Sequence, residues 1–72
     1  MATEIEAQIT GSVWKVLVAP GDEVEEEATL IIFESMKMEI PLEAESAGKV
    51  LEVRVQEGQS VTEGDVVLVL EP

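Results

Sequence analysis

The sequence predicts an all-β domain folded as a sandwich or flattened barrel, and three observations lead to that prediction. First, 22 of the 72 residues are Val, Leu or Ile, and 16 of these are β-branched, which favours strands. Second, the chain repeats itself once at an offset of 37 residues. Third, no stretch has convincing helical periodicity, and residues 23–28 are the only weak candidate. Two similar β units without a helix can bury their apolar faces by pairing around a pseudo-two-fold axis.

The repeat relates residues 4–34 to residues 41–71 without a gap, and the hairpin 35–40 joins the two copies. We therefore expect one domain over residues 1–72. A two-fold axis would place the chain ends side by side, at the pole opposite residues 35–40. Ten of the 31 aligned pairs are identical: Glu6/Glu43, Ala7/Ala44, Gly11/Gly48, Val13/Val50, Val16/Val53, Val18/Val55, Gly21/Gly58, Val24/Val61, Glu26/Glu63 and Glu34/Glu71.

Each copy begins with the same short elements. A strand is expected at residues 5–8 and again at residues 42–45. A single valine follows the second turn of each copy, and we expect Val24 and Val61 to pack into the core. The glycines expected in turns are Gly11, Gly21, Gly48, Gly58 and Gly64.

Two longer strands complete each copy. The first alternates apolar and polar residues, so one of its faces should be buried, with Trp14 in the core or at its edge. The last strand, at 29–34 and 66–71, is apolar at nearly every position, which predicts a strand that is buried on both faces or central in a sheet. The expected buried face of the alternating strand is Trp14, Val16 and Val18 in the first copy and Leu51, Val53 and Val55 in the second.

Composition limits the functions that the chain can have. Sixteen acidic and four basic residues give a formal net charge of −12, so the basic surface that nucleic acids and anionic membranes require is absent. The chain has no Cys and no His, which excludes disulfides, thiolate or imidazole metal sites, and Ser-His-Asp or Cys-His catalysis. A chain of 72 residues is also too short for a deep catalytic cleft, so we expect a protein that is not an enzyme.

Other classes are disfavoured by missing patterns. The acidic residues 22–27 lack the spacing of a calcium loop, and we expect a solvated acidic face with no metal site. The first residues do not have the pattern of a signal peptide, and no apolar run approaches the roughly 18 residues of a membrane-spanning helix. We expect a monomer in the cytoplasm or in an organelle matrix.

The connector between the copies has unusual turn chemistry. Residues 34–40 read Glu-Ser-Met-Lys-Met-Glu-Ile, although a tight hairpin normally has Gly, Asn or Asp at its centre. Local rules that are broken in an otherwise consistent sequence indicate a functional site. The spacing of Met36 and Met38 would also suit two core residues on one face of a strand, but that interpretation leaves the lysine between them unexplained.

Lys37 has three interpretations. It is an ordinary solubility residue if the chain is a purely structural β module. It could form a Schiff base only in a desolvated pocket, which so small a chain does not offer. The remaining interpretation is that Lys37 is itself a substrate, an amine that a sharp hairpin holds out for another enzyme to acylate.

The run Glu34-Ser35-Met36-Lys37-Met38 resembles the biotin attachment signature Glu-Ala-Met-Lys-Met of biotin carboxyl carrier domains. The resemblance covers the whole chain and points to the short stand-alone biotin/lipoyl attachment proteins and the biotinyl domains of carboxylases. It implies a flattened barrel of two four-stranded antiparallel sheets with quasi-two-fold symmetry. The other segments that match the family pattern are Gly11–Val16, Pro20–Val24, Gly48–Val50 and Glu57–Asp65.

The resemblance also implies a function and a cofactor. A biotin protein ligase would attach biotin covalently to Lys37. The biotinyl arm would then carry carboxylate from a biotin carboxylase to a carboxyltransferase, while the carrier itself does no bond chemistry. The hairpin residues that the ligase would recognise are Met36 and Met38, with Glu34, Ser35 and Glu39 beside them.

The alternative is a lipoyl carrier domain of a 2-oxoacid dehydrogenase or glycine cleavage system, which would share the fold and the lysine position. Its usual signature has Asp before the lysine and a small residue after it, whereas Lys37 has Met on both sides. Two other positions depart from the biotinyl pattern: Glu27 replaces a glycine like Gly64, and Glu45 replaces a common proline. Glu27 would reduce stability if its position requires positive φ.

Overall fold

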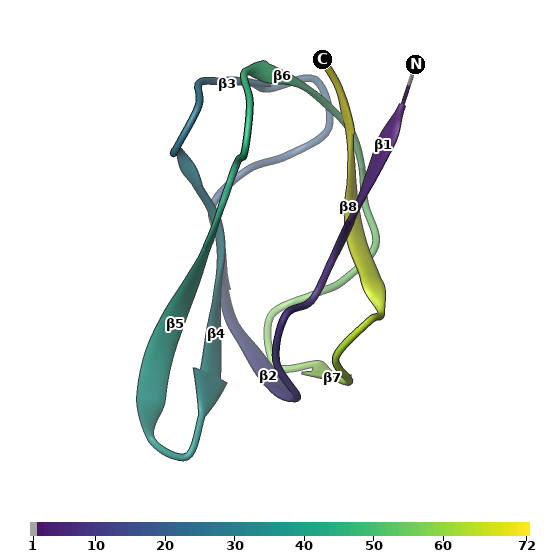
Figure 1. The fold of residues 1–72 in the computed structure, drawn as a ribbon. Helices are drawn as coiled ribbons and strands as arrows, with labels where there is room; N and C mark the ends of the chain where they lie inside the picture. Colours follow the sequence, from purple (N-terminus) through teal and green to yellow (C-terminus); the bar gives the residue numbers. More distant parts are fainter. Residues whose placement is uncertain (1) are drawn as a thin grey trace.

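Residues 2–72, which the computed structural model describes, form eight β-strands in two antiparallel sheets. The sheets have the strand orders β1-β8-β6-β3 and β5-β4-β2-β7, and they face each other across the core (Figure 1). This arrangement confirms the predicted all-β class with two four-stranded sheets. The strands are β1 (Thr3–Glu6), β2 (Gly11–Val16), β3 (Glu23–Val24), β4 (Thr29–Ser35), β5 (Met38–Glu43), β6 (Gly48–Val53), β7 (Ser60–Val61) and β8 (Val66–Glu71).

The two sheets are equivalent under the 37-residue offset of the sequence. Every residue pair in the sheet β1-β8-β6-β3 has its counterpart in the other sheet, so that Val50↔Leu70 corresponds to Val13↔Phe33. The irregular positions between paired strands recur at equivalent places as well. Each sheet therefore contains strands from both halves of the chain, which ties the halves together around the quasi-two-fold axis.

The beginning of β1 and the end of β8 lie side by side at one end of the molecule, and the β4–β5 turn lies at the other end (Figure 1). Near the chain ends, Thr3 in β1 pairs with Leu70 in β8. This is the placement expected from a two-fold axis that exchanges the two copies. The Cα atoms extend over 33 × 18 × 17 Å, so the turn projects from one end of an elongated body.

The core is formed mainly by β4 and β8, each an inner strand of its sheet. Leu30 and Ile31 in β4, and Val67 and Leu68 in β8, have no exposed surface. The short strands β3 and β7 each add one buried valine, Val24 or Val61, as predicted. Both apolar strands predicted to be central occupy central positions, because each is flanked by partners on both edges and covered by the facing sheet.

The prediction that Trp14 and Leu51 belong to the buried face is wrong. The pairing register shifts at Trp14 in β2 and at Leu51 in β6, so each strand contains one extra residue there. The extra residue interrupts the alternation of side chains between the two faces. Trp14 is consequently 41% exposed and Leu51 42%, while the preceding Val13 is only 1% exposed.

Three element boundaries also differ from the prediction. β1 spans Thr3–Glu6, two residues earlier than expected, and β5 begins at Met38 and runs through Pro41 rather than starting at residue 42. Pro41 is tolerated because β5 is an edge strand, where a residue without a backbone N–H leaves few hydrogen bonds unmade. Residues 23–28 form β3 and a turn, not a helix.

One turn contains a glutamate where its counterpart contains a glycine. Glu27 has a φ of 71°, and Gly64, at the equivalent position, has a φ of 96°. The backbone N–H of Glu27 donates to the carbonyl of Ala44 at 2.8 Å, which holds the residue in this conformation. A non-glycine residue in the left-handed region costs about 1–2 kcal/mol, because its Cβ approaches the following carbonyl.

We expect Glu27→Gly to raise the free energy of unfolding by about 1 kcal/mol, because glycine adopts positive φ without that steric cost. Urea denaturation followed by tryptophan fluorescence measures the change. Glu26→Gly is the matched control, since Glu26 has an ordinary φ and glycine there only adds freedom to the unfolded chain. A decrease of equal size in both variants would contradict the proposed strain.

Candidate functional site

The β4–β5 turn places Lys37 at one end of the molecule. Ser35 and Met38 form the last residue pair of the hairpin, which leaves Met36 and Lys37 as a two-residue turn. Their φ angles are 53° and 64°, the positive values of a type I′ turn, which normally selects Asn and Gly. The residue types that are unusual for a tight turn therefore coincide with backbone strain at Met36 and Lys37, the two residues that form the tip.

The base of the hairpin is tied to two neighbouring loops. The Ser35 hydroxyl donates a hydrogen bond to the Thr10 carbonyl at 3.1 Å. The Thr10 hydroxyl in turn accepts one from the backbone N–H of Glu63, also at 3.1 Å. These contacts link the turn to the loops before β2 and before β8, so the base of the strained tip is anchored to the body of the domain.

Gly11 allows the hairpin base to approach β2 closely. A Cβ at Gly11 would lie 2.5 Å from the Glu34 carbonyl oxygen, and Gly48 has the same relation to Glu71 at 2.7 Å. The prediction that Gly11 and Gly48 are turn glycines is therefore wrong, since they begin β2 and β6 and are required by close packing. The repeat of the two glycines was the only sequence signal for this role, and Thr10 had none.

The tip is surrounded by solvent. Met36 is 91% exposed and Met38 is 64% exposed, and Lys37 between them is exposed as well. Within residues 2–72 the ion pairs closer than 4 Å all involve Arg54, so the Lys37 ammonium has no carboxylate partner there. An exposed primary amine on a protruding turn is accessible to an acylating enzyme, whereas the dry pocket that a Schiff-base lysine requires is missing around it.

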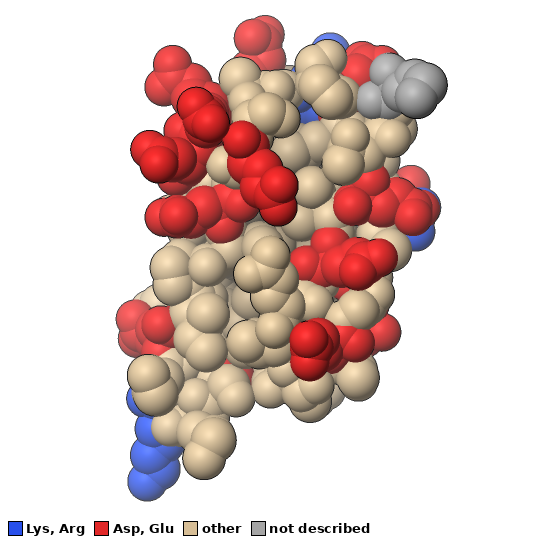
Figure 2. Space-filling model, in the orientation of Figure 1, with Lys and Arg blue, Asp and Glu red and all other residues tan. Residues whose placement is uncertain are grey.

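The charge of the molecule is distributed unevenly. Figure 2 shows a basic group at the tip of the molecule, over the β4–β5 turn, while carboxylates gather over the opposite end and along the β1–β8 side. The carboxylates nearest the tip in sequence are Glu34 and Glu39, which face each other across the hairpin. All six residues predicted for the site, 34–39, therefore lie in one hairpin, with the amine at its end.

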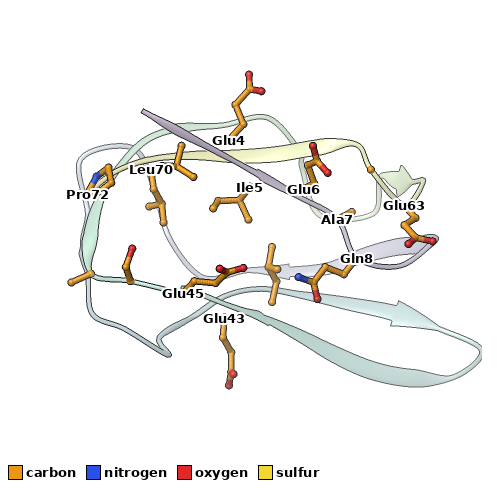
Figure 3. Close-up of a pocket in the computed structure, with 15 residues that line it drawn as sticks. Glu4, Ile5, Glu6, Ala7, Gln8, Glu43, Glu45, Glu63, Leu70 and Pro72 are labelled. Atoms are coloured by element: carbon orange, nitrogen blue, oxygen red, sulfur yellow. The ribbon is translucent and has the colours of Figure 1, made fainter. Parts of the chain in front are cut away.

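A groove of about 640 Å³ lies between the edge strands β1 and β5 (Figure 3). Ile5 and Leu70 point into it, and Glu45 and Gln8 lie along it. Its lining contains no lysine or arginine, and the residues described hold no group of three or more acidic side chains that could bind a metal ion. The charged side chains of the groove are all glutamates. Within residues 2–72 no helix is long and apolar enough to cross a membrane.

The comparisons with known proteins agree with this geometry. The family model described as "Biotin-requiring enzyme" matches residues 1–70. A biotin/lipoyl attachment protein of Bacillus subtilis is 48% identical over 66 residues, which are 92% of this chain and 90% of that protein. A biotin carboxyl carrier protein of Streptococcus mutans is 44% identical over 64 residues, covering 89% of this chain and 49% of that protein.

A solved structure of the Kluyveromyces lactis urea carboxylase contains a similar domain. It superposes with a TM-score of 0.91 and 37% sequence identity, over 99% of this chain and 6% of that chain. The same fold thus occurs both in proteins of this length and as a small part of a large carboxylase. The match to the family model over nearly the whole chain shows that the chain belongs to the biotin/lipoyl attachment domain family.

Proposed function

We propose that this chain is a biotin carboxyl carrier domain and that Lys37 is the residue that carries biotin. The single observation that supports this site best is the placement of Lys37 at the exposed end of a strained two-residue turn. In the attachment step, the Lys37 amine attacks the carbonyl of biotinyl-adenylate, made by the ligase from biotin and ATP. An amide forms, AMP leaves, and the amine loses a proton. The modification removes one positive charge from the chain.

The hairpin residues supply recognition rather than chemistry. Met36 and Met38 project from the tip, where a ligase approaching Lys37 must touch them. Glu34 and Glu39 stand opposite each other below the tip and present paired carboxylates to an approaching enzyme. Ser35 positions the turn from the base of the hairpin, through the hydrogen bond that its hydroxyl donates to the Thr10 carbonyl. We assign these five residues to ligase recognition or to positioning of the turn.

The carrier has no catalytic role of its own in this proposal. The chain contains no His and no Cys, and Lys37 does not line the groove between β1 and β5. The biotin ring would accept carboxylate in the active site of a biotin carboxylase and release it in a carboxyltransferase. A small acidic monomer suits brief visits to both enzymes, because charge attraction raises encounter rates without requiring tight binding. We retain the cytoplasm as its predicted location.

Lipoylation is the weaker alternative. The fold and the position of the lysine suit both modifications, and the name of the Bacillus subtilis relative includes both. The residues that differ are those beside the lysine, and Met36 and Met38 match the biotin signature on both sides. The similarity to a biotin carboxyl carrier protein and to a urea carboxylase favours biotin in the same way.

We expect Lys37→Arg to abolish modification, because the guanidinium is always protonated and does not form the amide. The test is the intact mass of the chain after co-expression with a biotin protein ligase. The wild type should gain one biotinyl increment and Lys37→Arg none. Lys49→Arg is the matched control, because Lys49 is also exposed, and it should be modified fully. A lipoyl increment, or no increment on the wild type, would refute the biotin assignment.

The variant Met36→Asn distinguishes the effect of the strained backbone at Met36 from the effect of its exposed side chain on the ligase. Asparagine tolerates positive φ, so the variant should gain about 0.5–1 kcal/mol of unfolding free energy. It also removes the exposed thioether, so the rate of biotinylation should fall. Denaturation and a ligase assay measure the two effects. If the rate of biotinylation stays at the wild-type value, the ligase does not recognise the Met36 side chain.

We expect Gly11→Ala and Gly48→Ala to destabilise the fold by a similar amount, about 1–3 kcal/mol, because each new Cβ meets a carbonyl oxygen. Only Gly11→Ala disturbs the hairpin base, so only this variant should slow biotinylation under conditions where both remain folded. Thermal melts and ligase kinetics at a low temperature compare the pair. Equal rates would show that the hairpin does not depend on the packing at Gly11.

A further inference from the structure

The outer faces of the two sheets are equivalent in position but carry different side chains. On the sheet β1-β8-β6-β3, Glu4, Val69 and Glu52 form a row across three strands. Arg54 donates a hydrogen bond to Glu52 and lies 3.7 Å from Glu4, and hydrogen bonding to Glu52 raises the pKa of Arg54. Val69, below this network, is only 8% exposed. The charged network therefore covers the apolar centre of this face.

The other outer face lacks that cover. Pro41, Ile32 and Lys15 form the equivalent row on the sheet β5-β4-β2-β7, and Leu17 stands where the first face has Arg54. Leu17 is 52% exposed, and Trp14 is 41% exposed. We define the β4 outer face as Trp14, Leu17, Ile32 and Pro41. The two outer faces therefore differ. Charged side chains cover the apolar centre of the sheet β1-β8-β6-β3, whereas the outer face of the sheet that carries Lys37 is apolar at its centre.

The charges around the β4 outer face are mostly negative. Glu34 and Glu39 lie on the same side of the sheet, one row nearer the turn, and Glu43 lies beyond Pro41 on β5. One cation is present, the Lys15 ammonium, which sits 5.5 Å above the centre of the Trp14 ring. An apolar surface bordered by carboxylates is complementary to an apolar patch with Lys or Arg at its rim. A second copy of this chain would bring like charges together, since each copy carries a net charge of −12.

We propose that the β4 outer face is a docking surface for the biotin protein ligase, through an apolar patch with a basic rim on that enzyme. The inference rests on the proposed function. Ile32 and Pro41 of this face belong to the hairpin β4–β5 that carries Lys37, and Ile32 is four residues, or about 13 Å, from Met36. The ligase must bring the lysine amine itself into its active site, so its surface has to meet the strands beside the turn. The carboxylases instead meet biotin at the end of a long arm, which requires less contact with the body.

Trp14→Ala and Leu51→Ala provide a matched test. The two residues occupy equivalent positions on opposite outer faces, and their exposed fractions are 41% and 42%. With a purified ligase, we expect Trp14→Ala to raise the KM for the carrier about tenfold while kcat changes little, the effect of losing one central interface side chain. Leu51→Ala should have the wild-type KM. Added salt should raise the KM of the wild type, because the rim contacts are charged.

A second variant covers the case in which Trp14→Ala fails to fold. Leu17→Arg copies the residue that the other face has at the equivalent position, so it should fold and still raise KM about tenfold. If either variant and Leu51→Ala give the same KM, the docking surface is refuted and the proposed function stands. If the wild type takes up no biotin, the proposed function fails and this inference fails with it. A wild-type dimer in sedimentation that Trp14→Ala dissociates would assign the face to a second copy and overturn the proposal.

Discussion

The packing of β4 against β8 is the interaction on which the rest of the structure depends. The chain has no disulfide, and its stability comes from a core whose fully buried side chains lie mostly on these two strands. Each half of the repeat contributes one of them, and each is one of the two inner strands of its sheet. The strain at Met36 and Lys37, about 1–2 kcal/mol per residue, is comparable to burying one or two aliphatic side chains. The free energy gained by burying the core side chains can therefore offset the strain of the turn, as long as β4 remains paired in its sheet over its whole length.

The repeat carried most of the information from which the fold could be predicted. An ungapped offset implies equal registers in both halves, and a two-fold axis then places the chain ends opposite the β4–β5 turn. The failures were local. An extra residue at Trp14 reverses the face on which a side chain lies, and nothing in an apolar strand sequence marks where that happens. The Thr10 contact to the hairpin was equally invisible, because it joins loops whose approach depends on the finished sandwich.

The two copies differ mainly at outward-facing positions and in turns. Backbone register is shared almost throughout, because it follows from the core, which neither copy can change alone. Divergence is concentrated on outward-facing positions, such as Leu17 opposite Arg54, and in turns, such as Glu27 opposite Gly64. The two-fold symmetry does not include the connections at the two ends of the molecule. One pair of strands is joined by a turn that presents Lys37, while the equivalent pair carries the chain ends. A duplicated structural unit therefore presents only one such turn, and with it one proposed modification site.

The size of the molecule constrains how such a carrier can bind. The total accessible surface is 4603 Å², and a standard protein–protein interface buries about 800 Å² on each partner, about a sixth of this surface. A partner bound through an interface of that size and apolar throughout would dissociate slowly and hold the carrier away from the next enzyme. Four apolar side chains bordered by carboxylates form a smaller surface, on which charge speeds encounter while limited apolar contact permits release. An acidic body with few cations would therefore favour the repeated, short-lived docking that the proposed function requires.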